Sequence, residues 1–194
     1  KAVNGAIISA DSMQVYRHMD IGSAKIRPEE MRGVPHYLID VLDPSEEFHV
    51  VKFVELAHEA MEKIYAAGQI PIVTGGTGFY IQALLKEVDF TESHGELPIR
   101  KQLEEKAATE EGAAELYREL SEVDPASAET IHPNNVKRVI RALEYYHETG
   151  QKISEHNEEQ KQKESPYCSA YFVLNDERSI LYDRIDRRVD QMIC

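Results

Sequence analysis

A carboxylate at the end of an apolar run is the first residue in the chain whose type could do chemistry. Asp11 follows the apolar residues 6–9. A carboxylate at the end of a strand can act as a general base or bind a metal. An aspartate in this position is also a common N-cap for the segment that follows it, and taken alone the cap is the simpler interpretation.

A glycine-rich segment, residues 74–78 (TGGTG), follows a second apolar run and precedes the apolar residues 79–85. Glycines let a ligand approach the backbone closely, and exposed N–H groups at the start of a helix attract anions. A tight turn without a ligand explains the pattern equally well. The dinucleotide fingerprint G-x-G-x-x-G is absent.

Basic residues cluster near residue 140 on a segment that predicts a helix over 136–148. Arg141 follows Lys137 by four residues and Arg138 by three, so the three cations share one region of the helix surface. Such a compact cationic patch suits phosphate groups. The alternative is a solvated helix face on which Arg141 pairs with Glu144.

Two arginines of the last predicted helix fall within its apolar sector. Arg178 and Arg188 project on that side and Arg187 does not. A guanidinium that points inward needs a partner, because burial of an unpaired charge is expensive. Carboxylates of the core or a bound diphosphate could supply it.

Metal and disulfide chemistry have little support in the sequence. The 8 histidines show no metal-ligand spacing, and the 2 cysteines, Cys168 and Cys194, exclude a disulfide scaffold and a four-cysteine zinc site. Cys168 is predicted to be a buried small hydrophobic residue. A reduced, cytoplasmic setting is the expectation.

Short apolar runs that alternate with helical patterns must position these residues. Residues 6–9, 37–39, 70–73 and 171–174 predict strands buried on both faces, and residues 50–67 predict an amphipathic helix. This alternation is typical of an α/β domain with a mainly parallel sheet.

Ligands of open parallel sheets bind beyond the carboxyl ends of the strands. The predicted strands bring four segments to that edge. They are Asp11, Asp40, residues 74–78 and residues 175–178.

Residues 93–165 differ in character, because strand patterns disappear and helical ones dominate. They predict a helical insertion in the α/β domain. Its capping signals are Asp124 followed by Pro125, Asn134 or Asn135 before the helix at 136–148, and Gly150 after it. Residues 154–164 are polar without periodicity and predict an exposed helix end or a mobile connection.

Composition sets further bounds. With 194 residues and 42% hydrophobic residues, the chain can form one packed domain with a modest insertion, and no apolar run is long enough to span a membrane. The net charge of -13 argues against a nucleic-acid binder of the usual basic kind, except where basic residues cluster. The chain starts at Lys1 and stops within a predicted helix, so we expect a piece of a longer protein.

Taken together, these segments resemble the tRNA dimethylallyltransferase family, also called tRNA isopentenyltransferases. The similarity follows the order of the family's motifs along nearly the whole chain. The matching segments are residues 7–16 (IISADSMQVY), 20–25 (DIGSAK), 36–40 (HYLID), 74–80 (TGGTGFY), 132–135 (HPNN), 138–144 (RVIRALE), and residues 178, 181, 184–185 and 188–192.

The resemblance implies a P-loop NTPase-like α/β core, residues 1–92 and 166–194, with a helical tRNA-binding insertion, residues 93–165. The implied reaction transfers a dimethylallyl group from dimethylallyl diphosphate to N6 of adenosine 37 in the tRNA anticodon loop and releases diphosphate. Mg²⁺ as a cofactor, ATP or nucleotide binding, the tRNA anticodon stem-loop as partner, and a cytoplasmic monomer that spans no membrane are further expectations.

The resemblance also implies roles for individual residues. Asp11 is expected to be the base that removes the N6 proton and to contact the tRNA. Arg178 is expected to act in catalysis through contact with the diphosphate, and Thr77 to act in catalysis and tRNA contact. The other expected tRNA contacts are Ser12, Met13, Gln14, Arg100, Lys137, Arg138, Val139, Ile140 and Arg141.

This chain also departs from the family pattern. The P-loop G-x-x-x-x-G-K-[ST] does not occur in it, and Ser23 stands where the family usually has Thr. Because that loop would cradle the diphosphate, these 194 residues by themselves are predicted to be inactive.

Two alternatives stay open at this point. A P-loop small-molecule kinase would consume ATP without tRNA. A noncatalytic RNA-binding module would bind tRNA in a salt-dependent way that Asp11→Ala leaves unchanged.

Overall fold

The computed structural model describes residues 1–88 and 98–193. The chain divides into two compact units, one made of Lys1–Glu87 with Ser165–Cys194 and the other of Val88–Glu164. The predicted boundary between residues 92 and 93 lies outside the described residues.

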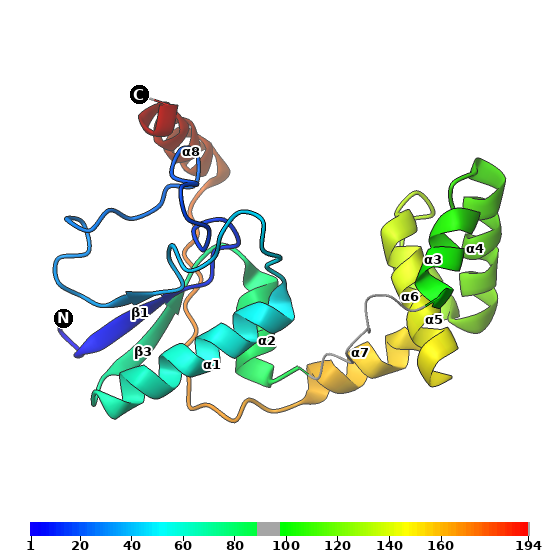
Figure 1. The fold of residues 1–194 in the computed structure, drawn as a ribbon, viewed down its shortest axis with the longest axis horizontal. Helices are drawn as coiled ribbons and strands as arrows, with labels where there is room; N and C mark the ends of the chain where they lie inside the picture. Colours follow the sequence, from blue (N-terminus) through cyan, green and yellow to red (C-terminus); the bar gives the residue numbers. More distant parts are fainter. Residues whose placement is uncertain (89–97, 194) are drawn as a thin grey trace. The chain divides into compact units, whose positions relative to one another are not determined.

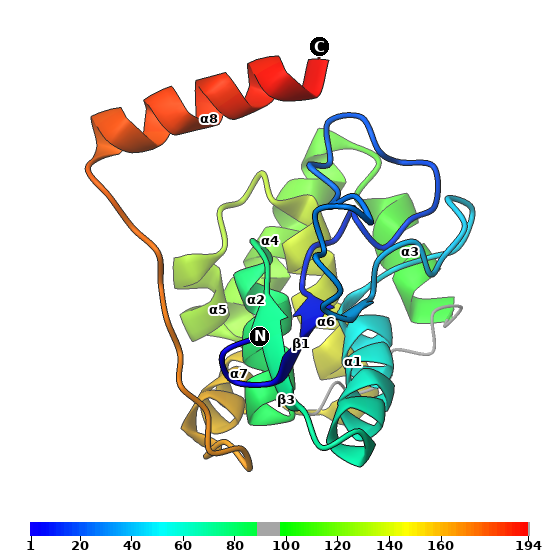
Figure 2. The same ribbon diagram turned by 90° about the vertical axis from the view of Figure 1, so that its left-hand side faces the viewer.

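The first unit is built on a small parallel sheet. Its strands are β1 (Gly5–Ser9), β2 (His36–Tyr37) and β3 (Ile70–Thr74), in the order β2-β1-β3. Figures 1 and 2 show β1 and β3 side by side and pointing the same way. The mixed α/β class with a parallel sheet is confirmed, and so are the predicted strands at 6–9 and 70–73.

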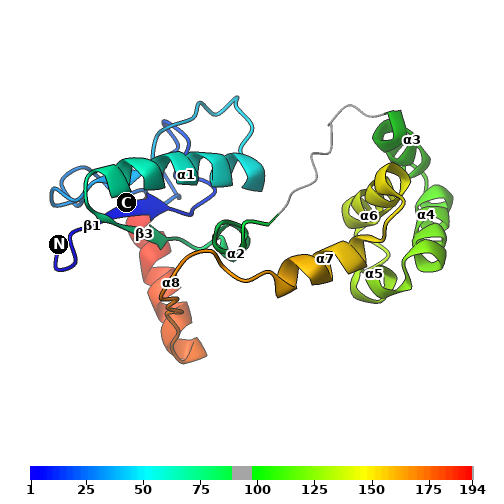
Figure 3. The ribbon, with the colours of Figure 1, turned by 90° about the horizontal axis from the view of Figure 1, so that it is seen from below.

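Helices α1 (Val50–Ala66) and α2 (Gly78–Lys86) pack on this sheet. Figure 3 shows α1 lying along the sheet. Helix α1 begins at the cap His49, whose side chain accepts from the backbone N–H of Lys52, and Gly68 turns the chain after it with a φ of +68°. The helix buries its predicted apolar stripe, and Phe53 stacks on Tyr80 of α2 at 4.9 Å between ring centroids. The predicted helix over 50–67 is confirmed.

The second unit consists of helices in the described residues. They are α3 (Pro98–Lys106), α4 (Glu110–Val123), α5 (Pro125–Thr130), α6 (Val136–Thr149) and α7 (Ile153–Gln162). Helix α6 packs against α3 and α4 through a core that includes Leu103, Leu120 and Leu143 (Figure 1). The predicted helix near 136–148 and its end at Gly150, which adopts a φ of +70°, are confirmed.

Asp124 links two helices of this unit. Its carboxylate accepts from the backbone N–H and hydroxyl of Ser127 at the start of α5, and from the same two groups of Ser154 near the start of α7. Burial raises the pKa of Asp124, but these hydrogen bonds outweigh it and hold the pKa below its ordinary value. The predicted cap at Asp124 with Pro125 in the first turn is confirmed.

The predicted strand at 37–39 is too long. The structure forms β2 over His36–Tyr37 only, because Leu38 and Asp40 adopt positive φ angles of 62° and 55°. These left-handed conformations turn the chain out of the sheet. The sequence carries no glycine there that would have indicated such a turn.

The predicted strand at 171–174 is wrong in the described structure. Residues 171–174 have no strand partner, and their side chains are exposed, Leu174 to 96%. Burial of β3 on both faces is also wrong, because Ile70 and Ile72 stay 54% and 36% exposed. An apolar run becomes a buried strand only where a neighbouring backbone takes up its N–H and C=O groups.

The last helix, α8 (Arg178–Ile193), buries none of its described side chains. The prediction that Arg178 and Arg188 point into a core is therefore wrong. Cys168 is exposed rather than buried, because the segment that holds it does not join the sheet. Over residues 1–88 and 98–193, no helix has both the length and the apolar character needed to cross a membrane.

Candidate functional site

The carboxyl ends of β1 and β3 meet at one edge of the first unit, as the parallel sheet requires. Ser9 pairs with Thr74, and the backbone N–H of Ala10 donates to the carbonyl of Thr74 at 2.8 Å. The N–H of Thr77 then donates back to the carbonyl of Ala10 at 3.3 Å. These bonds place the glycine loop beside the residue that precedes Asp11, as the sequence predicts for this edge.

Gly75 makes this close approach possible. A Cβ atom added at Gly75 would lie 2.4 Å from the backbone carbon and oxygen of Ala10, which no real side chain tolerates. A Cβ at Gly76 or Gly78 would meet nothing within 4 Å. The first of these glycines thus serves packing, and the other two border open space that a ligand could use.

Asp11 caps the turn that follows β1. Its Oδ1 accepts from the backbone N–H of Met13 at 2.8 Å and from that of Gln14 at 3.2 Å, as expected for an N-cap. Its Oδ2 makes no hydrogen bond to the described part of the chain. One oxygen can therefore hold the turn while the other receives a proton, so the two interpretations of Asp11 are compatible.

The other predicted residues of this segment differ in how they are used. The Gln14 side chain connects the end of β1 to the loop at residues 23–24. Its Oε1 accepts from Ser9 Oγ at 3.3 Å, and its Nε2 donates to the carbonyls of Ser23 and Ala24. Met13 is 43% exposed, and Ser12 is partly exposed. Gln14 thus organises the edge, whereas Ser12 and Met13 are open to a ligand.

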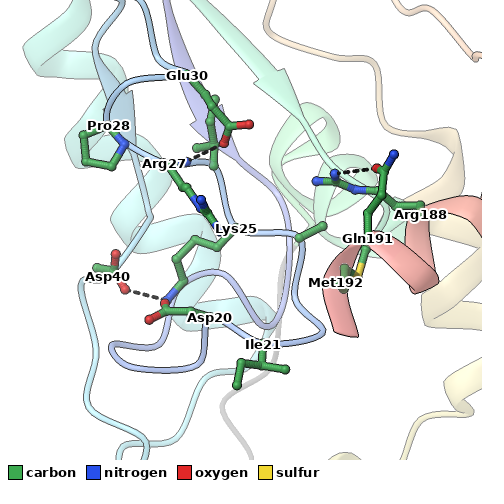
Figure 4. A pocket seen from close by; sticks show the side chains of 12 residues that line it. Asp20, Ile21, Lys25, Arg27, Pro28, Glu30, Asp40, Arg188, Gln191 and Met192 are labelled. Atoms are coloured by element: carbon green, nitrogen blue, oxygen red, sulfur yellow. Dashed lines mark hydrogen bonds and ion pairs between the residues drawn. The ribbon is translucent and has the colours of Figure 1, made fainter. Parts of the chain in front are cut away.

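Lys25 organises this region of the fold, although the sequence did not single it out. Its Nζ lies 2.7 Å from Asp20 Oδ1, 2.6 Å from Asp40 Oδ1 and 2.7 Å from the carbonyl of Tyr16, and its side chain is 6% exposed (Figure 4). Burial lowers the pKa of this ammonium, but the bonds to the two aspartates outweigh it and raise the pKa above its ordinary value. Its only sequence signal is its place in the motif at 20–25.

Figure 4 also shows the hollow beside Lys25. It has a volume of about 530 Å³ and is lined by the loop around residues 20–30 and by Arg188, Gln191 and Met192 of α8.

Arg178, the predicted diphosphate contact, is the first residue of α8. Its guanidinium lies over the ring of Tyr182, 5.8 Å from the centroid. Within the described residues, no hydrogen bond or ion pair joins it to Asp11 or Thr77. The structure brings Asp11 and Thr77 to one edge and does not bring Arg178 into contact with them.

In the second unit, the start of α6 carries the predicted cationic patch. Lys137 and Arg138 are exposed in its first turn, and neither forms an ion pair with the described residues. Cations are disfavoured at a helix N-terminus, whose N–H groups favour anions. The side chains of Val139 and Ile140 are buried in the core of this unit, so they support the patch from inside.

The remaining two predicted cations share one carboxylate. Arg100 of α3 and Arg141 of α6 both contact Glu144, which is fully buried. The Arg141–Glu144 pair is one of the alternatives that the sequence offers. The contact of Arg100 with Glu144 is not among them, because these two residues lie 44 positions apart. The available signal is a glutamate next to Leu143 and four residues after Ile140, on the buried side of α6.

Possible metal-binding side chains do not cluster in residues 1–88 and 98–193. No group of three His, Cys, Asp or Glu side chains comes together there in a way that could hold a metal ion. Mg²⁺ often keeps several waters and takes only one or two carboxylates beside substrate phosphates, so the expected cofactor stays a prediction.

Comparison with known proteins adds a family to this geometry. The family model described as IPP transferase matches residues 14–194. A tRNA dimethylallyltransferase of Lachnoclostridium phytofermentans is 63% identical over all of this chain and 61% of its own length, and one of Bacillus mycoides is 49% identical over all of this chain and 60% of its own. The chain thus spans about three fifths of the length of these curated relatives.

Solved structures show the same relationship. The full-length tRNA isopentenylpyrophosphate transferase of Bacillus halodurans is 45% identical, covers 99% of this chain over 58% of its own length, and has a TM-score of 0.62. A eukaryotic dimethylallyltransferase solved acting on tRNA is 38% identical, covers 99% of this chain over 47% of its own, and has a TM-score of 0.82.

Proposed function

The chain belongs to the IPP transferase family, and from that premise we propose that its protein transfers a dimethylallyl group from dimethylallyl diphosphate to N6 of adenosine 37 in the tRNA anticodon loop, releasing diphosphate. The structural neighbours are tRNA isopentenyltransferases, whose fold is P-loop NTPase-like. Their names do not favour a small-molecule kinase or a noncatalytic RNA-binding module.

The observation that carries the proposal is that the two oxygens of the Asp11 carboxylate differ in their hydrogen bonding. Oδ1 is held by two backbone N–H groups, which fixes the orientation of the side chain beside the glycine loop. Oδ2 is left to take the N6 proton while N6 bonds to the allylic carbon and the bond from that carbon to the diphosphate oxygen breaks. An exocyclic amine is a weak nucleophile, so a base that removes its proton as the bond forms lowers the barrier.

We assign supporting roles from the same contacts. Thr77 occupies the cap position of α2 without a side-chain capping bond, so its hydroxyl is available to the substrate. The open space at Gly76 and Gly78 leaves room for the target base, which must leave its stack to reach Asp11. Arg178 is assigned to the departing diphosphate on the family pattern. In this role its guanidinium would have to lie near Asp11, and no described hydrogen bond or ion pair brings it there.

The second unit is assigned to the tRNA backbone. Lys137 and Arg138 carry positive charge at the N-terminus of α6, where the helix itself attracts phosphate. Phosphate contacts of this kind position an RNA without reading its sequence. A cluster of exposed cations explains how a chain with a net charge of -13 could bind tRNA.

Mg²⁺, nucleotide binding, a cytoplasmic location and a monomeric state stay predictions. No step of the proposal depends on Mg²⁺.

The test uses the full-length protein. It is incubated with dimethylallyl diphosphate, Mg²⁺ and tRNA, and the digested tRNA is searched for prenylated adenosine by mass spectrometry. Asp11→Asn keeps an oxygen that can hold the turn and removes the base, so the rate of prenylation should fall by about 10² to 10⁴ while tRNA affinity is kept. Asp11→Ala loses the turn as well, and a wild-type rate in either variant would refute the assignment of the base.

A further inference from the structure

The carboxylate of Glu144 is the only fully buried acidic side chain of α6, and it is contacted by two helices. Arg141 Nη1, one turn earlier on the same helix, lies 2.9 Å from Oε2. Arg100 Nη1 of α3 lies 3.4 Å from Oε1 and 3.5 Å from Oε2. The Glu144 side chain is 1% exposed. A carboxylate in that position is costly unless it is paired, so the two arginines are required partners.

The two guanidiniums themselves are not buried. The side chain of Arg100 is 40% exposed and that of Arg141 is 35% exposed. A guanidinium has five N–H donors, and Glu144 engages one nitrogen of each arginine. In each arginine, one guanidinium nitrogen is therefore bound to Glu144, and other N–H donors are available to a ligand at the surface.

Glu144 also makes it possible for two cations to lie close together. Without a negative charge between them, two guanidiniums this close together would repel each other and turn toward solvent in different directions. The shared carboxylate offsets that repulsion and orients both planar forks, which is the geometry that suits a phosphate.

We propose that Glu144 is a positioning residue for tRNA binding, which holds Arg100 and Arg141 as a pair that contacts phosphates of the tRNA backbone. This inference rests on the proposed function, because it concerns how the same second unit binds its RNA. Glu144 does not touch the tRNA, and its contribution is made through the two arginines. The opposing interpretation is that the arginines serve only to neutralise Glu144 and contribute to folding.

The chain offers a matched control. Glu104 also contacts Arg100, from Oε1 to Nε at 3.2 Å, but its side chain is 56% exposed and it does not contact Arg141. Glu144→Gln and Glu104→Gln thus remove the same charge from two carboxylates that share Arg100. Only the first removes the link between the two arginines.

The experiment measures tRNA binding by the full-length protein over a range of salt concentrations, with melting temperatures taken in parallel. Glu144→Gln is expected to raise the Kd for tRNA about tenfold and to reduce the salt dependence of binding by about one to two released ions. In turnover, KM for tRNA should rise while kcat at saturating tRNA is kept. Glu104→Gln should leave Kd and KM within about twofold of wild type.

A double-mutant cycle separates positioning from folding. Arg141→Ala should weaken tRNA binding about tenfold in the wild-type background and much less in the Glu144→Gln background, because its orientation is already lost there. If Arg141→Ala costs the same affinity in both backgrounds, or if Glu144→Gln lowers the melting temperature and leaves Kd and its salt dependence unchanged, the inference is wrong.

A second variant covers the case in which Glu144→Gln does not fold. Arg141→Lys keeps a positive charge for Glu144 and loses the fork, so it should fold and bind tRNA more weakly. Wild-type affinity in a folded Arg141→Lys protein would overturn the inference. The failure of the proposed function would look different, because then the unsubstituted protein would prenylate no tRNA at all.

Discussion

The backbone N–H of Thr77 donates to the carbonyl of Ala10 at 3.3 Å, which ties the glycine loop to the end of β1. Together with the bond from the N–H of Ala10 to the carbonyl of Thr74, it joins two motifs that lie more than sixty residues apart in the sequence. It brings the backbone of Thr77 to the residue before Asp11, and in the described part of the chain no hydrogen bond joins the two side chains. The assignment of both residues to one reaction depends on this arrangement.

Gly75→Ala should disturb that edge of the sheet. The added methyl group would lie 2.4 Å from the backbone of Ala10, so β1 or the loop must move, at a cost of about 1–3 kcal/mol in the free energy of unfolding. The prenylation rate should fall with it. Gly76→Ala is the control, because its methyl group meets nothing within 4 Å, and its stability should stay within about 0.5 kcal/mol of wild type. Equal stability of the two variants in urea unfolding would contradict the packing role.

Removal of the exposed cations of α6 should weaken tRNA binding and leave the fold intact. Lys137→Ala and Arg138→Ala each remove a positive charge from a helix N-terminus, where it opposes the helix dipole, so the melting temperature should stay constant or rise slightly. Each should reduce the salt dependence of tRNA binding by about one ion. Arg118→Ala, an exposed arginine on α4, is the comparison, and it should change the salt dependence less. A salt dependence that does not change in the α6 variants would remove them from the interface.

Loss of charge on Asp124 should destabilise the second unit in acid. The pKa of Asp124 is lowered in the folded protein, so its contribution to stability is complete above the unfolded value near 4 and is lost as the pH falls through the folded pKa. Asp124→Asn should cost about 1–3 kcal/mol at pH 7, because Ser154 and Ser127 lose acceptors in a buried site.

The check for Asp124 is thermal unfolding followed from pH 7 to pH 3. The difference in stability between wild type and Asp124→Asn should be constant down to about pH 5 and should shrink below pH 4. Ser121→Ala, which removes an exposed hydroxyl that bonds only to the carbonyl of Tyr117, serves as the control and should show no such dependence. A difference that grows on acidification would show that the sign of the pKa shift is wrong.

Lys25→Met should loosen the loop between β1 and β2. The substitution keeps an unbranched side chain of similar length and removes the ammonium that bonds to Asp20, Asp40 and the carbonyl of Tyr16. Trypsin should then cleave faster after Arg17 and Arg32, two basic residues of this loop that no proline follows. Lys52→Met is the control, because Lys52 is partly exposed and its ion pair is with Glu55 on its own helix. Unchanged cleavage in the Lys25 variant would show that the loop does not depend on this contact.

The sequence by itself determined the features that depend on neighbours along the chain. The ends of α1 at Gly68 and of α6 at Gly150, and the start of α5 at Asp124, follow from capping residues within a turn of the helix. The ordered motifs indicate the family in the same way, because each motif is a short run of neighbouring residues. Local rules are enough here because a helix forms its hydrogen bonds within four residues.

Only the tertiary structure decided the features that join distant segments. Residues 171–174 carry the same apolar pattern as β1 and form no strand, since a strand needs a neighbouring backbone and the pattern does not say which one is present. Glu144 looks like a surface partner of Arg141 in the sequence, and it becomes a buried link because α3 brings Arg100 to it from 44 residues away. Pairing between backbones and between buried charges is a property of the packed molecule, so composition and periodicity cannot supply it.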